Sequence, residues 1–145
     1  MTDELDKFVD LLQDRIFDET RMEFGEKAYN RWLEPKFMER MALPDGYAKQ
    51  TGTCGDTMEI FLIFENDRVA AASFMTDGCG PSVVCGSYAA ELAHGKSPED
   101  LADFNGDMIL EILGGLPEDH KHCAHLATET VKRALDDYMA RSVKG

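Results

Sequence analysis

The sequence has few basic residues, no long apolar run and no C-x-x-C pair. Lysine and arginine together number 15 against 28 aspartate and glutamate residues, which gives a net charge of -13 at pH 7. This charge opposes contact with nucleic-acid phosphates and anionic membrane surfaces, so we expect neither as a partner. No stretch approaches the ~18 apolar residues of a membrane span and no signal peptide is evident, so we expect a cytoplasmic protein without an anchor.

The length and composition fit one compact domain. The chain has 145 residues, of which 43% are hydrophobic, enough to fill one core. No internal repeat, low-complexity run or linker divides it. In a reducing compartment its four cysteines are better candidates for ligands, reactive thiols or core packing than for disulfides.

The first half of the chain predicts helices followed by a small sheet. Apolar residues recur at steps of three and four over residues 2–16, which predicts an amphipathic helix. A second helix is predicted around Trp32, before a proline that would end it. Residues 58–64 and 69–75 predict an antiparallel hairpin, to which residues 47–53 add a third strand.

The second half predicts a series of helices. Pro81 suits the first turn of a helix that Gly95 can end. Ser97 and Pro98 are typical of an N-cap and a first helical position, and Asn105 can cap another short helix that ends at the Gly-Gly pair. A long amphipathic helix then closes the chain.

Three of the cysteines lie at the ends of predicted elements. Cys54 ends a strand, whereas Cys79 precedes a helix and Cys123 opens one. Helix N-termini favour thiolate over thiol, and therefore favour metal binding and nucleophilic reactivity. Cys85 falls inside a helix beside two valines, and we interpret it as a small buried residue.

The spacing of these cysteines differs from that of a zinc finger. Three thiolates with Asp56 or His122 still make a tetrahedral site, with one spare candidate ligand that would permit exchange. The adjacency of His122 to Cys123 favours it as a ligand. The other histidines are not adjacent to a cysteine, and we interpret them as solvated or structural: His94, His120 and His125.

A cysteine hydrolase is an alternative use of the same residues. Cys123 or Cys54 would be the nucleophile, with His122 and Asp56 as its partners. Against this, the neighbouring side chains of His122 and Cys123 are expected to diverge on a helix, and the sequence indicates no substrate pocket.

The motifs CGD at Cys54, GCG at Cys79 and HC at His122 occur in an order, with a hairpin between the first two, that resembles the IscU/NifU-type iron-sulfur cluster assembly scaffolds. The resemblance runs from about Ala28 to Tyr138. It implies an α+β domain whose small antiparallel three-stranded sheet packs on helices, with three loops converging at one edge. The amphipathic helix predicted before it would be an extension, so we expect residues 1–27 to form a helical extension and residues 28–145 the scaffold domain.

The resemblance also implies a function that is not enzymatic. Such a scaffold receives sulfur as persulfide from a cysteine desulfurase, collects iron and electrons, assembles a transient 2Fe-2S cluster and passes it to apo-proteins. The matching positions imply Cys123 as the persulfide acceptor and the following cluster-site residues: Cys54, Asp56, Cys79, His122 and Cys123.

A zinc-bound sulfur carrier that partners a cysteine desulfurase is the second function considered. Zinc could occupy the same residues. The related zinc-dependent SufU branch carries an insertion between the second and third cysteines and usually an arginine in place of the histidine. This chain has no such insertion and has His122, which favours the scaffold.

Overall fold

The computed structural model describes residues 25–53, 55–78, 80–116 and 120–144. The helix predicted over residues 2–16 lies outside these ranges, as do Cys54 and Cys79. Among the helices that are described, none combines the length and the apolar character needed to cross a membrane.

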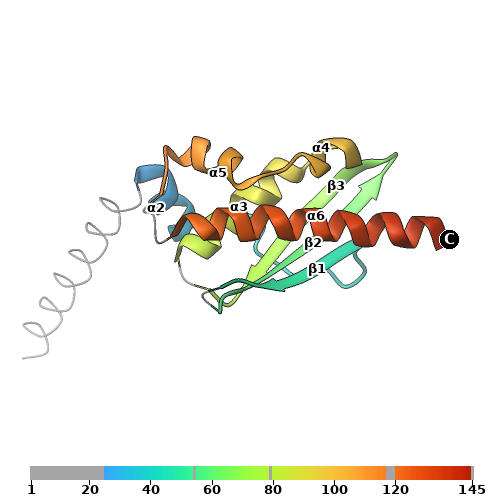
Figure 1. The fold of residues 1–145 in the computed structure, drawn as a ribbon, viewed down its shortest axis with the longest axis horizontal. Helices are drawn as coiled ribbons and strands as arrows, with labels where there is room; N and C mark the ends of the chain where they lie inside the picture. Colours follow the sequence, from blue (N-terminus) through green and yellow to red (C-terminus); the bar gives the residue numbers. More distant parts are fainter. Residues whose placement is uncertain (1–24, 54, 79, 117–119, 145) are drawn as a thin grey trace, which may run out of the picture.

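The fold is a three-stranded sheet with helices packed against it. Along the chain its elements are α2 (Glu26–Leu33), β1 (Gly46–Thr51), β2 (Thr57–Glu65), β3 (Arg68–Thr76), α3 (Gly80–Ala93), α4 (Pro98–Ala102), α5 (Gly106–Leu113) and α6 (Lys121–Lys144). The sheet order is β1-β2-β3, and both pairings are antiparallel. Figure 1 shows α3 and α6 crossing the sheet, with α4 and α5 beside them and α2 at one end. The predicted α+β fold is confirmed.

Local signals account for several boundaries. The β2–β3 hairpin turns at Asn66 and Asp67, whose φ angles of 52° and 62° are those that a tight two-residue turn requires. Ser97 caps α4 with a reciprocal pair of hydrogen bonds to Asp100, which confirms the predicted N-cap. Gly114 ends α5 in the left-handed conformation. Asn105 occupies the N-cap position of α5, but its side chain makes no capping hydrogen bond.

The core lies between the sheet and the pair α3 and α6. Met58, Ile60 and Leu62 alternate along β2, and all three are fully buried in this layer. Helix α3 is buried around almost its whole circumference. It approaches β3 so closely that a Cβ at Gly86 would overlap the ring of Phe74. Glycine at this position therefore sets the distance between α3 and the sheet.

Helix α2 is fastened along α3. The Arg31 guanidinium donates hydrogen bonds to Ser87 Oγ at 3.0 Å and to Glu91 Oε1 at 3.1 Å, and it stacks over the Tyr88 ring. At the other end, the indole of Trp32 lies against Gly80, where an added Cβ would be 3.2 Å from Nε1. These contacts hold α2 along the length of α3, and the contact of Trp32 lies at the first residue of α3.

A buried carboxylate lies on the opposite face of the sheet. Glu59 accepts two hydrogen bonds from Arg40, at 2.9 and 2.8 Å, and one from the Tyr47 hydroxyl at 2.6 Å. Burial opposes its ionisation, but the hydrogen bonds from Arg40 and Tyr47 outweigh burial and hold the pKa of Glu59 below its ordinary value of 4.5. Burial and the bond to Glu59 raise the pKa of Tyr47 to about 12. The cluster holds the segment between α2 and β1 against the sheet.

Glu59→Gln should lower the free energy of unfolding at pH 7 by about 1–3 kcal/mol, because the amide cannot accept from both donors on both atoms. The depressed pKa makes this stabilisation fully present above pH 4.5, and it is lost as the pH falls through the folded-state pKa. Urea unfolding of parent and variant should therefore show a gap that narrows in acid. Glu65→Gln, an exposed carboxylate on the same strand, is the control; a gap independent of pH would contradict the assignment.

Candidate metal centre

The connection between β1 and β2 places Asp56 at the start of the sheet's central strand. The Gly52 N–H donates to the Asp56 carbonyl at 2.8 Å, and the Gly55 N–H donates to the Gly52 carbonyl at 3.0 Å. Gly55 has a φ of 90°, a conformation that strongly favours glycine. The chain thus reverses tightly and presents the Asp56 side chain toward α3.

The start of α3 meets that side chain. Ser82, which is fully buried, donates a hydrogen bond from Oγ to Asp56 Oδ2 at 2.9 Å. Gly78, in the connection before α3, is so close that an added Cβ would lie 2.9 Å from Asp56 Cγ. The β3–α3 connection is therefore packed directly against Asp56.

Helix α6 contributes His122 and Cys123 from its first turn. Cys123 is 1% exposed, and its Sγ lies 3.6 Å from Ser82 Oγ and 3.6 Å from His122 Nε2. The expectation that these neighbouring side chains diverge is wrong here. The imidazole reaches back toward the buried cysteine, which brings its Nε2 near the sulfur.

Three of the five predicted ligands thus converge. The ligand atoms of Asp56, His122 and Cys123 all lie within 4.8 Å of one another. Donors on one tetrahedral metal, at 2.0–2.3 Å from it, are about 3.3–3.8 Å apart, so small side-chain movements would let the three groups share an ion. The other two predicted ligands, Cys54 and Cys79, lie outside the described residues.

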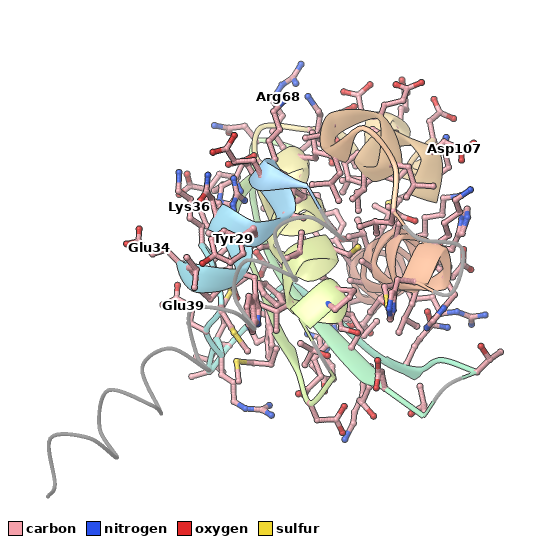
Figure 2. All side chains as sticks on the ribbon, turned by 90° about the vertical axis from the view of Figure 1, so that its left-hand side faces the viewer. Tyr29, Glu34, Lys36, Glu39, Arg68 and Asp107 are labelled. Atoms are coloured by element: carbon pink, nitrogen blue, oxygen red, sulfur yellow. The ribbon has the colours of Figure 1, made fainter. Side chains whose placement is uncertain are left out.

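The three converging residues, Asp56, His122 and Cys123, are called the trio below, and they differ in how far solvent reaches them. Cys123 is buried, whereas Asp56 and His122 are half-buried. The starts of β2, α3 and α6 lie at the same side of the molecule, which faces the viewer in Figure 2, where α2 with its labelled Tyr29 lies beside α3. A soft sulfur donor held inside and harder oxygen and nitrogen donors toward solvent suit a metal site that exchanges its ligands.

Two features of this region had no clear signal in the sequence. Ser82 could have been noticed only as a hydroxyl three residues after Cys79 in a very apolar helix. A cavity of about 460 Å³ also opens beside His122; it is lined by the end of β1, the start of α5 and one side of α6, including Gln50, Asn105 and Lys132. Its walls come from three distant segments, so no local pattern indicates it.

Cys85 and His94 lie apart from the trio. Cys85 is fully buried in the core, as expected. Nε2 of His94 accepts a hydrogen bond from the Ala72 N–H at 3.3 Å, and its Nδ1 lies 2.8 Å from the Ala90 carbonyl, so this histidine joins α3 to β3. His125 is exposed and lines the cavity.

Cys85→Ser should keep metal binding while lowering the free energy of unfolding by about 1–3 kcal/mol, because a hydroxyl replaces a small apolar group in the core. Parallel measurements of cobalt binding and urea unfolding would test this. Loss of metal binding by a protein that is still folded would place Cys85 in the site.

Comparison with known proteins identifies the family. The sequence profile of the NifU-like N terminal domain matches residues 27–145. The chain belongs to this family. Among NifU-like relatives, the iron-sulfur cluster assembly scaffold protein IscU 1 of Archaeoglobus fulgidus is 30% identical over 122 residues, which cover 83% of this chain and 80% of the relative. The scaffold protein IscU of Aquifex aeolicus is 33% identical over 124 residues, covering 82% and 78%.

A solved NifU-like structure agrees with the fold. The N-terminal part of a nitrogen-fixing NifU-like protein from Brucella abortus has a TM-score of 0.66 and 15% identity, and the match covers 84% of this chain and 98% of that one. The resemblance identified from the three cysteine motifs is confirmed at the level of the NifU-like family.

Proposed function

We propose that the protein is a scaffold that assembles a 2Fe-2S cluster from iron and desulfurase-derived sulfur and transfers it to apo-proteins. The cluster is cargo, which is built and released whole, so the protein is not an enzyme. The convergence of Asp56, His122 and Cys123 within 4.8 Å carries the proposal, because it joins thiol, imidazole and carboxylate at an accessible edge. The names of the A. fulgidus and A. aeolicus relatives support it.

In the proposed site, thiols and harder donors have different roles. Cys54, Cys79 and Cys123 would hold the cluster as thiolates, and Asp56 or His122 would be the exchangeable fourth ligand. Sulfur would enter when the Cys123 thiolate attacks the terminal sulfur of the desulfurase persulfide and expels the desulfurase thiolate. That exchange conserves atoms and electrons and leaves a persulfide on Cys123.

The same proposal assigns domains and partners. Residues 28–145 form the scaffold domain, and residues 1–27 form a helical extension that supplies no ligand. The partners are a cysteine desulfurase, apo iron-sulfur acceptor proteins and, through the apolar stripe of the extension, a second copy of the chain. Nucleic acid and membranes are not partners, and the compartment is the cytoplasm.

Anaerobic reconstitution tests the proposal. Incubation with ferrous iron, cysteine, a desulfurase and a thiol reductant, which supplies the electrons that turn persulfide sulfur into sulfide, should produce the visible absorption and Mössbauer spectrum of a 2Fe-2S cluster, followed by transfer to an apo-ferredoxin. A protein that remains colourless under these conditions would contradict the scaffold function.

A zinc-bound sulfur carrier is the second candidate, because the same three side chains suit zinc. In that case anaerobically purified protein should be colourless, contain zinc and accept persulfide without building a cluster. Zinc content alone does not decide between the two, since a vacant thiolate site binds zinc readily.

A further inference from the structure

Ser82 lies between two of the converging groups, the Asp56 carboxylate and the Cys123 sulfur. Its hydroxyl is fully buried in the first turn of α3, donates to Asp56 Oδ2 at 2.9 Å and lies 3.6 Å from Cys123 Sγ. It thereby links three segments that are far apart in the sequence: the β1–β2 connection, α3 and α6. Because the hydroxyl hydrogen goes to Asp56, the Cys123 thiol can donate to the hydroxyl oxygen.

Two other serines are buried as completely but lie elsewhere. Ser87 accepts hydrogen bonds from Arg31 and from the Lys36 N–H and donates to the Lys36 carbonyl, which fastens the segment after α2. The Ser73 hydroxyl has no hydrogen-bond partner among the residues that the structure describes. Among these three serines, the hydroxyl of Ser82 is the one directed at the proposed metal-binding groups, so general packing of α3 does not account for it.

We propose that Ser82 is a positioning residue for metal capture, which holds the Asp56 carboxylate toward Cys123 before an ion arrives. This rests on the proposed role of Asp56 as a ligand. A carboxylate has two oxygens, so the one bound to Ser82 can keep its hydrogen bond while the other takes the ion. Asp56 is half-buried on a tight loop, and without the hydroxyl its side chain would have to be ordered at the moment of binding.

Cobalt(II) titration of the full chain under anaerobic conditions is the test, because the ligand-field and thiolate charge-transfer bands report the donors directly. Ser82→Ala should bind cobalt about 10-fold more weakly, the lower end of the effect typical of residues that orient a metal ligand. Ser87→Ala and Ser73→Ala are matched controls, since each removes an equally buried hydroxyl away from the trio, and both should keep the parent affinity. An unchanged cobalt affinity in Ser82→Ala would overturn the proposal.

A double-mutant cycle separates positioning from packing. If Ser82 acts through Asp56, Ser82→Ala should have no further effect on cobalt affinity in an Asp56→Ala background. Additive losses would show that Ser82 acts by another route and would overturn the proposal.

The pair Ser82→Thr and Ser82→Val adds a comparison that is independent of stability. The two side chains are nearly equal in shape, and the threonine alone keeps the hydroxyl. The Ser82→Thr protein should bind cobalt about 10-fold more tightly than the Ser82→Val protein; equal affinities would contradict the hydroxyl's role. A parent protein that shows this cobalt behaviour but builds no cluster would overturn the scaffold function and leave the role of Ser82 supported.

Discussion

Cys123→Ser should accept no persulfide sulfur and should assemble about 100-fold less cluster than the parent protein, because a serine hydroxyl is neither an effective nucleophile toward sulfur nor a soft ligand. Two features of Cys123 support this expectation. It lies in the first turn of α6, where the helix dipole favours thiolate. His122 Nε2 lies 3.6 Å from its sulfur. Because the sulfur is 1% exposed, the first turn of α6 has to open for the desulfurase persulfide to reach it.

Peptide mass spectrometry after a desulfurase reaction measures the sulfur directly. The parent should carry one added sulfur on the peptide that contains Cys123, and the Cys123→Ser protein should carry none. Cys85→Ser, which changes a buried cysteine away from the trio, is the control and should be labelled like the parent. Labelling confined to Cys54 or Cys79 in the parent would refute Cys123 as the acceptor.

Asp56→Ala should hold an assembled cluster about 10-fold longer than the parent and transfer it correspondingly more slowly. A carboxylate oxygen is a weak ligand for iron in a sulfur-rich site and offers a route for ligand exchange. Its removal leaves the three cysteines and closes that route. The same change should weaken capture of a single metal ion, so entry of the metal and release of the cluster respond in opposite directions.

Decay of the visible absorption in air and transfer to apo-ferredoxin measure this effect. Asp77→Asn is the matched control: its carboxylate is close by in the β3–α3 connection, but it accepts a hydrogen bond from the Thr57 N–H at 2.7 Å and is not one of the three converging groups. Equal lifetimes in Asp56→Ala and the parent would remove Asp56 from cluster release and favour His122 as the exchangeable ligand.

The parts of the fold that the sequence predicted are those encoded locally. The hairpin follows from two apolar runs separated by a turn at Asn66 and Asp67, and α4 follows from the Ser97 and Pro98 signal. The cysteine motifs placed Asp56, His122 and Cys123 near one edge because each is attached to the end of an element. Residues 1–24, Cys54 and Cys79 lie outside the described residues, so the N-terminal helix and the full ligand set stay predictions.

The parts that the sequence did not predict depend on contacts between distant segments. In the sequence Glu59 is an ordinary strand residue. Its burial as a carboxylate depends on hydrogen bonds from Arg40 and Tyr47, which only the folded chain brings to it. In the sequence Ser82 is one small residue in an apolar helix. Its role depends on the fold, which places its hydroxyl 2.9 Å from Asp56 Oδ2. The closeness of His122 to Cys123 depends on side-chain rotamers that α3 and the sheet select by packing, and sequence spacing does not specify rotamers.

The indole of Trp32 packed on Gly80 gives the protein an internal optical probe. This is the chain's single tryptophan, so its emission comes from one known place, the first residue of α3 next to the connection that bears Cys79. Iron-sulfur chromophores absorb where indole emits, and a change in the packing of α3 would also shift the emission. If the proposed cluster is assembled there, tryptophan fluorescence should therefore follow loading and unloading of the unmodified protein in real time, without an attached dye.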